Sequence, residues 1–302
     1  MRPQPATCIP LASRASTVAS PIPLLTPVIM ATLPLKSIAR SAKMWGFRLK
    51  MQGSAPGRVL RAAVVLALTT ALAGCQKDNE AGCFTSTGNI ITERRSLPPF
   101  QRLTTYDNIT VVLVQDTATY AEVRAGKNLQ DDIRLEVTDG MLTVRNSSRC
   151  NWVRRYDAPR EVTLHLPQLT DLFLRGQADI RTEGPFRQDT ISPHLVGAGD
   201  MRLHLISRYV NMDQYELGDI YLTGSANELH HTLGGSGSFY AQDFLLRDAY
   251  LQTNSGSDGN ARLRSSRLLV GAHAGTGTVF YALPAPTTLG LAVTGRGQLR
   301  PE

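Results

Sequence analysis

The chain has 302 residues and a formal net charge of +7. Residues 1–74 hold nine of the 32 Lys and Arg residues and no Asp or Glu, so the remainder carries 23 basic residues (32 − 9) against 25 acidic ones. The basic excess belongs to the leader. Because the remainder has no surplus of cations to neutralise phosphates, we expect no nucleic-acid partner.

The leader ends in a pattern typical of a bacterial lipoprotein signal. Arg58 and Arg61 precede an apolar run at 62–68, and small residues lead to Cys75. A positive start, a short apolar core and small residues before a cleavage point describe a secretory signal peptide. Because Leu72-Ala73-Gly74-Cys75 resembles a lipobox, we expect acylation of Cys75 and attachment to a membrane through the lipid. The alternative is an ordinary signal peptide followed by a chance cysteine.

Residues 1–50 lie upstream of this signal and lack acidic residues, so we expect the natural start at Met44 or Met51. Residues 75–90 form a lipidated tether. Its residues 76–80, Gln-Lys-Asp-Asn-Glu, resemble a short export signal that sends lipoproteins to the outer face of the outer membrane. A plain polar tether is the alternative. We therefore expect an exported lipoprotein of the outer membrane, exposed at the cell surface if the export signal operates.

Two cysteines remain after Cys8 in the leader and the lipidated Cys75. Cys83 and Cys150 would lie in an oxidising compartment, where one disulfide between them is expected to form. Two free thiols are the alternative, because the sequence does not reveal the separation of the two residues.

Residues 91–302 are expected to form a single domain, and its first part, 91–166, consists of short strands. Apolar and β-branched residues predict strands at 109–115, 120–124, 133–137, 141–145 and 161–166. Asp139-Gly140 between the third and fourth strands predicts a tight hairpin turn. A polar loop at 146–160 precedes the last strand. We expect this part to cap one end of the fold that follows.

From 169 to 300 the sequence repeats with a period near 20 residues. Glycine turns begin at Gly176, Gly197, Gly235, Gly256, Gly275 and Gly295, with Glu216 at the equivalent position of a further repeat. A strand-and-turn sequence with this period is typical of a solenoid, in which each repeat is one coil that cannot bury its apolar side alone. We expect an all-β solenoid of six to seven coils in parallel stacking.

An apolar column supports this alignment. Four residues after each turn glycine come Ile180, Met201, Ile220, Phe239, Val279 and Leu299. The column breaks at Asn260 in the Gly256 repeat. One extra residue at 257–259, as in a β-bulge, would restore the column with Ala261 and Leu263.

The chain resembles a known bacterial family at several places. The stretches 95–103 (Arg-Ser-Leu-Pro-Pro-Phe-Gln-Arg-Leu), 108–115, 128–133 and 136–144 resemble the start of the putative auto-transporter adhesin head GIN domain, and Gly197-Ala198-Gly199-Asp200-Met201 resembles its repeats. Tyr106-Asp107-Asn108 departs from the small residues that are common there. The resemblance implies a right-handed parallel β-helix without the catalytic residues of pectin lyases, and adhesion as the function.

Asp179, Asp200 and Asp219 occupy one position in three successive repeats and are the candidates for a metal site. They could bind Ca²⁺ or line an acidic groove, as oxygen ligands do. We favour the alternative that each carboxylate accepts hydrogen bonds from backbone amides of its own turn, because Ser238, Thr278 and Gln298 follow at the same position. We therefore expect neither a metal nor any other cofactor.

No catalytic constellation is apparent, since the remaining carboxylates show no paired position and the histidines no metal spacing. Tyr and Trp residues near Arg are typical anchors of binding surfaces. We expect binding residues at Trp152, Arg154, Arg155 and Tyr156 in the 146–160 loop; Tyr209, Tyr215, Tyr240 and Tyr250 are further candidates. The predicted function is a non-enzymatic adhesin or binding module for a glycan or an envelope or host protein. The alternatives are a carbohydrate-active β-helix enzyme and a structural spacer.

Overall fold

The computed structural model describes residues 86–148 and 158–302, and they belong to one compact unit, 77–302. The sites expected at Cys75, Cys83 and Cys150, and at Trp152, Arg154, Arg155 and Tyr156, lie outside the described residues and stay predictions. No helix within the described ranges is long and apolar enough to cross a membrane.

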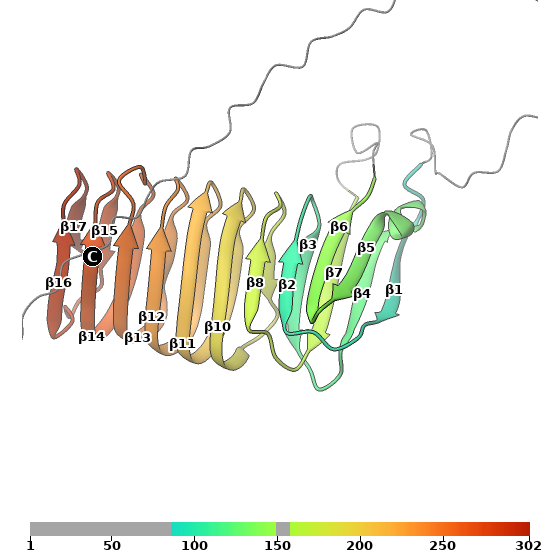
Figure 1. Ribbon diagram of the computed structural model, residues 1–302, viewed down its shortest axis with the longest axis horizontal. Coiled ribbons are helices and arrows are strands. Elements are labelled where there is room, and N and C mark those ends of the chain that lie inside the picture. Colours follow the sequence, from blue (N-terminus) through green and yellow to red (C-terminus); the bar gives the residue numbers. More distant parts are fainter. Residues whose placement is uncertain (1–85, 149–157) are drawn as a thin grey trace, which may run out of the picture. The chain divides into compact units, whose positions relative to one another are not determined.

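The C-terminal part is a β-solenoid of parallel strands, as the glycine period predicts (Figure 1). Its strands are β8 (Asp171–Leu174), β9 (Ile180–Thr182), β10 (Phe186–Gly197), β11 (Met201–Glu216), β12 (Ile220–Leu233), β13 (Phe239–Thr253), β14 (Ala261–His273), β15 (Thr278–Tyr281), β16 (Thr288–Val293) and β17 (Gln298–Pro301). Residue-by-residue pairing stacks one inward column, Ile180, Met201, Ile220, Phe239, Ala261, Val279 and Leu299. These positions are 21, 19, 19, 22, 18 and 20 residues apart.

The irregular repeat contains an insertion and still continues the apolar column. Ala261 pairs with Phe239 and Leu263 with Ala241, so the apolar column continues past Asn260. The restored column is therefore confirmed, but the expected single extra residue at 257–259 is wrong. Thr253 and Ala261 are eight residues apart, whereas the positions that pair with them, Leu233–Phe239 and His273–Val279, are six apart. The two extra residues precede Ser257, because Gly259 takes the corner position of Gly237. Ala261 is fully buried, and so is Phe239.

The strands before residue 167 do not simply precede the solenoid. Four of them extend the stack of coils: β2 (Arg102–Thr105), β3 (Thr110–Gln115), β6 (Met141–Asn146) and β7 (Arg160–Leu166). β2 pairs in parallel with both β6 and β8, and β3 pairs in parallel with both β7 and β9. The β2–β3 coil therefore lies between the β6–β7 coil and the β8–β9 coil, out of chain order. Coil stacking thus starts earlier than the glycine repeat indicates.

The remaining elements cover the N-terminal end of the stack. They are β1 (Ile90–Ser96), β4 (Tyr120–Gly126), the 3₁₀ helix η1 (Lys127–Asp132) and β5 (Ile133–Thr138). β4 pairs antiparallel with β7 and β1 with β4, while β5 forms an antiparallel hairpin with β6. Asp139 and Gly140 both have positive φ, as the primed hairpin turn requires. Gln130 of η1 is buried, and its amide donates to the carbonyls of Ile91 and Val123.

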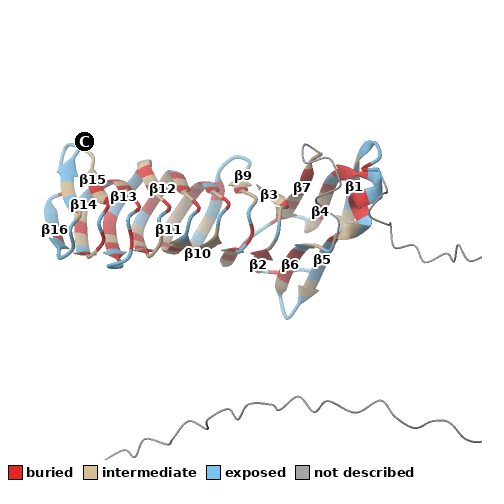
Figure 2. Cartoon of the chain, turned by 90° about the horizontal axis from the view of Figure 1, so that it is seen from above, coloured by how far each residue is buried: buried red, intermediate tan, exposed pale blue. Residues whose placement is uncertain are grey.

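The core is a stack of apolar columns inside the coils, which Figure 2 shows as buried residues alternating with more exposed ones along each strand. The corners between coils are too tight for side chains. A Cβ added to Gly237 would lie 1.9 Å from the carbonyl oxygen of Gly218 below it, whereas one added to Gly256 would meet nothing within 4 Å. Glycine is therefore a packing requirement at corner positions such as Gly237 and also at Gly259, where a Cβ would lie 2.0 Å from the carbonyl oxygen of Gly237, and not at Gly256.

Candidate functional site

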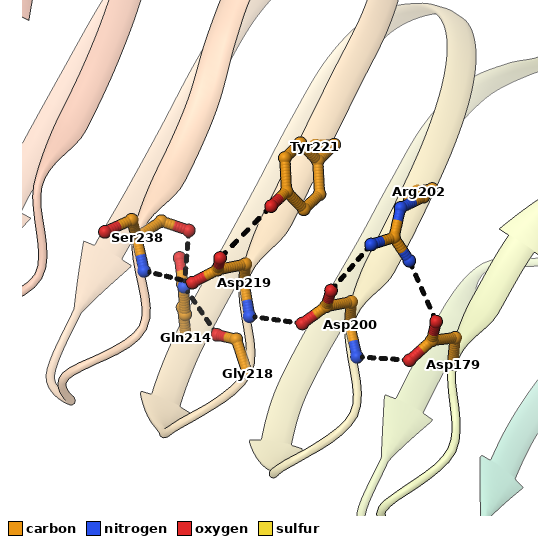
Figure 3. A network of polar contacts seen from close by, with 8 residues as sticks. All are labelled: Asp179, Asp200, Arg202, Gln214, Gly218, Asp219, Tyr221 and Ser238. Carbon is orange, nitrogen blue, oxygen red and sulfur yellow. Dashed lines mark hydrogen bonds and ion pairs between the residues drawn. The ribbon is translucent and has the colours of Figure 1, made fainter.

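The aspartate column forms a continuous hydrogen-bonded ladder that joins successive coils (Figure 3). Oδ1 of Asp179 accepts from the backbone N–H of Asp200 (3.0 Å), Oδ1 of Asp200 from Asp219 (3.0 Å), and Oδ1 of Asp219 from Ser238 (2.7 Å). Ser238 and Asn260 continue the ladder by accepting from the amides of Asn260 and Thr278. The donors lie in the next coil, not in the same turn, so the column stitches coils together.

The second carboxylate oxygens of this column are also engaged. Arg202 donates to Oδ2 of Asp179 and Oδ2 of Asp200, both at 2.8 Å, and the hydroxyl of Tyr221 donates to Oδ2 of Asp219. Burial alone would lower the pKa of Arg202, but the two carboxylates outweigh it and raise that pKa. Within the described ranges no group of three or more His, Cys, Asp or Glu residues could hold a metal ion. The geometry assigns these aspartates to the scaffold.

Two residues beyond the aspartate column, an outward column of arginines and aromatic residues runs along the same sheet. Residue pairing aligns Arg181, Arg202, Tyr221, Tyr240, Arg262, Phe280 and Arg300 on neighbouring strands. We call this column the Arg–aromatic ladder and the sheet surface that carries it the ladder face. The alternation of strand side chains places it outside the core, opposite to the buried column of Met201 and Ile220.

The members of the ladder contact one another along the stack. The rings of Tyr221 and Tyr240 are stacked, with centroids 4.7 Å apart and planes 9° apart. The guanidinium of Arg202 lies 4.9 Å from the Tyr221 centroid, and that of Arg262 lies 4.7 Å from Phe280. These cation–π contacts hold the arginines in place. Because the ring faces cover each other, the surface presents ring edges, a phenol hydroxyl and guanidinium groups.

Arg264 connects the ladder face to a groove of about 420 Å³. It lies two residues after Arg262 on β14 and is exposed. The groove is lined by Ser207, Ser225, Ala226, Asn227, Leu245, Leu246, Arg247, Arg264, Ser265, Ser266, Leu283 and Pro284. Two of these are arginines and none is acidic, while Leu245 and Leu283 are 60% and 62% exposed. The groove therefore suits an anionic ligand with an apolar part.

The solenoid carries a second, shorter aromatic column on another face. The rings of His230 and Tyr250 are stacked with centroids 4.3 Å apart, and Tyr209 contacts the same histidine at 5.3 Å. Nε2 of His230 lies 2.7 Å from Glu228. This column contains no arginine stacked on a ring, so it offers a matched comparison for the ladder.

Carboxylates in the described ranges do not form an obvious hydrolytic pair. Glu228 and Asp248 pair in register on β12 and β13, but Asp248 is only 5% exposed and binds Arg267 and Arg247. A second groove, of about 340 Å³, at the cap contains Glu93, Asp131 and Glu136 between arginines. Its arginine Arg95 donates to the carbonyls of Ile133 and Gln130, which indicates a structural role.

Sequence reasoning found part of this site. Tyr240, Tyr209 and Tyr250 were candidates by residue type, and the structure places Tyr240 in the ladder and the other two on the second face. Tyr221 and Arg262 were missed. The signal was present in the sequence, because Tyr221 occupies the same repeat position as Tyr240, and Arg262 does so once the insertion in its repeat is allowed for.

Comparison with known proteins agrees with the fold. The family model described as "Putative auto-transporter adhesin, head GIN domain" matches residues 99–282. Curated protein sequences give no match.

Solved structures share the fold at low sequence identity. A putative adhesin from Bacteroides fragilis is 18% identical with a TM-score of 0.63, covering 71% of this chain and 97% of that one. A putative adhesin from Parabacteroides distasonis is 16% identical with a TM-score of 0.56, covering 71% and 98%. A protein described as a putative lipid binding protein from Parabacteroides distasonis is 16% identical with a TM-score of 0.54, covering 72% and 98%.

Proposed function

We propose, from the premise that the chain belongs to the family of the putative auto-transporter adhesin head GIN domain, that it is a non-enzymatic binding module of the cell envelope. Its binding surface is the ladder face, and its partner is a protein. The single observation that carries this proposal is the Arg–aromatic ladder, in which Arg202, Tyr221, Tyr240 and Arg262 are stacked and outward-facing.

The chemistry of the ladder favours a protein over a glycan. Tyr and Arg are enriched among the residues that dominate protein–protein binding energy, and a pre-ordered side chain loses little entropy on binding. Stacking restrains the rings of Tyr221 and Tyr240 before any partner arrives. Sugars commonly pack on open aromatic faces, but here neighbouring side chains occupy those faces.

The test uses beads coated with residues 77–302, applied to panels of purified matrix and envelope proteins and to a glycan array. The double variant Tyr221→Ala/Tyr240→Ala should lose protein binding by at least about 30-fold, the equivalent of about 2 kcal/mol for a dominant contact. The control Tyr209→Ala/Tyr250→Ala alters the other face and should bind like the unchanged protein. Binding to glycans alone, or equal loss in both variants, would contradict the proposal.

A second candidate function rests on the groove beside Arg264. Its apolar residues Leu245 and Leu283 and its two arginines suit a fatty-acid-like anion, and a structure with this fold is described as a putative lipid binding protein. Displacement of a fluorescent fatty acid measures this directly. Binding that disappears in Leu283→Asp and weakens in Arg264→Ala would support the second function, and no saturable binding would exclude it.

The envelope location is part of the same proposal. The lipobox-like Leu72-Ala73-Gly74-Cys75 would anchor the chain, and residues 76–85 would give the solenoid reach from the membrane. The expected tether ends earlier than residue 90, because Thr87 is buried and Ile90 begins β1. Protease treatment of intact cells expressing the full chain should degrade the solenoid if it is surface-exposed. Protection in intact cells with degradation after lysis would place it inside the envelope.

A further inference from the structure

The two ends of the solenoid differ in how their edge strands are protected. Unpaired sheet edges bind other strands unless charge, proline or a covering segment prevents it. At the cap end, the edge strand β1 carries Glu93, Arg94 and Arg95, and the edge strand β5 carries Arg134 and Glu136. Charged side chains thus protect both edges there, and η1 lies beside them.

At the opposite end, one strand has such protection and the other has none. β17 contains Arg300 and Pro301, and Arg262 pairs with Glu302 next to it. β16 reads Thr-Leu-Gly-Leu-Ala-Val over Thr288–Val293, with neither charge nor proline. Residue pairing joins β16 to β14 alone among the described strands, and Figure 1 places β16 at the outer end of the row. A regular, uncharged edge strand is therefore left open.

The side chains of β16 also leave the end of the core uncovered. Leu289, Leu291 and Val293 pair with Leu269, Gly271 and His273 of β14. Leu269 and His273 are fully buried, and Leu291 is itself buried. These three side chains therefore continue the inward columns of the core. Leu289 is 39% exposed and Val293 42% exposed because no further coil among the described residues covers them. Figure 2 shows β16 as mostly exposed.

We propose that β16 pairs antiparallel with β16 of a second copy of this chain, with Leu291 at the centre of the pair. In that register Leu289 of each copy lies opposite Val293 of the other copy, and the two Leu291 residues lie opposite each other. All three then remain on the core side, and the core columns continue from one copy into the other. Gly290 lies opposite Ala292 on the outer side, where both are small.

Self-complementarity is the reason for choosing a second copy as the partner. In an antiparallel pair, residues directly opposite each other point to the same face of the sheet. The two-fold axis must therefore pass through a residue and not between two residues. With the axis at Leu291, every inward apolar side chain lies opposite another inward apolar side chain. The same patch serves both copies, so the assembly closes as a two-fold dimer and cannot grow into a fibre. The dimer would present two ladder faces, which raises avidity for a multivalent partner.

Sedimentation equilibrium of residues 77–302 tests the dimer, because this segment is one compact unit and lacks the apolar run of the leader. A small end-on interface predicts reversible dimerisation at concentrations on the order of 10–100 μM. Leu289→Lys and Val293→Lys place a charge at the edge and should give monomers with unchanged circular dichroism. Leu245→Lys changes another exposed leucine, on a side face, and should leave the dimer intact.

Disulfide trapping tests the register independently of stability. In a chain with Cys83→Ser and Cys150→Ser, Leu291→Cys places two thiols directly opposite each other, at a separation of about 5 Å between Cα atoms that permits a disulfide. Leu289→Cys places them four residues apart, about 13 Å, which does not permit one. Rapid trapping at 291 and not at 289 is expected. A monomer at every concentration, or equal trapping at both positions, overturns the proposal.

Discussion

His231 is the residue whose replacement most sharply tests the packing of the solenoid. It is 2% exposed on β12, stacks in register between Met212 and Leu251, and contacts the ring of Phe239 with centroids 4.0 Å apart. Neither ring nitrogen has a hydrogen-bond partner. Burial in this apolar column lowers the pKa of His231 from 6.5 to about 3. The perturbation is His231→Leu, which fits the column and removes the titrating group.

The magnitude follows from proton linkage. The folded pKa lies below the unfolded one, so the unfolded chain binds the proton first as pH falls. Stability from this group is complete above about pH 6.5 and decreases down to about pH 3. Each pH unit in that window contributes about 1.4 kcal/mol, so between pH 7 and pH 4 the unchanged protein loses about 3 kcal/mol through His231 alone.

Urea unfolding at pH 7, 5.5 and 4 measures the effect. Carboxylates add their own pH dependence to the stability of the variant and of the unchanged protein alike. The informative quantity is therefore the difference in unfolding free energy between the two proteins at each pH. His231→Leu should unfold at higher urea than the unchanged protein at pH 4, and should be more stable by about 1–3 kcal/mol at pH 7 because no unpaired polar atom remains buried. The control His230→Gln replaces the neighbouring histidine, which is half-exposed, and so shows whether the change in pH dependence belongs to His231. If the free energy of unfolding depends on pH in the same way in His231→Leu and in the unchanged protein, the inference that His231 is buried in its neutral form is wrong.

Three further predictions concern the ladder of aspartates and the corners. Asp200→Ala removes the acceptor for the Asp219 amide and an ion pair of Arg202, and should lower the free energy of unfolding by about 1.5–3 kcal/mol in a denaturant titration. Calcium at millimolar concentration should leave the thermal midpoint unchanged, because Arg202, Tyr221 and backbone amides already engage the carboxylates of this column; a rise that Asp200→Ala abolishes would restore the metal interpretation. Gly237→Ala should destabilise strongly, by about 3 kcal/mol or more, and Gly256→Ala should change stability by less than about 1 kcal/mol, since only the first would place a Cβ against a carbonyl.

The coil period and the continuation of the apolar column at Ala261 could be predicted because both are local patterns. Each coil repeats the same inward position, so an insertion is visible as a break in the apolar column that a shift repairs. The pattern indicates one extra residue at 257–259, whereas the pairing of neighbouring coils places two before Ser257. The opposite orientation of His230, which is half-exposed, and His231, which is buried, follows from an equally local rule, since neighbours on a strand face opposite sides.

The rest depends on contacts between distant residues. Nothing within 102–174 indicates that β2 pairs with both β6 and β8, because that choice is made between strands far apart in sequence. The sequence pattern predicts that Asp179 and Asp200 accept hydrogen bonds from backbone amides of their own turns. They do accept backbone hydrogen bonds, but the donors lie in the next coil, which a pattern within one turn does not reveal. The Arg–aromatic ladder mixes residue types and becomes visible only when strands are aligned.

We propose that the ladder face, and not the second face that carries Tyr209 and Tyr250, binds the partner. The most direct measurement is the affinity of residues 77–302 for a partner identified on the protein panel, compared between Tyr221→Ala/Tyr240→Ala and Tyr209→Ala/Tyr250→Ala. We expect a loss of at least about 30-fold in the first variant and of less than about threefold in the second. Unchanged affinity in the first variant, with circular dichroism showing that it is folded, would contradict the claim.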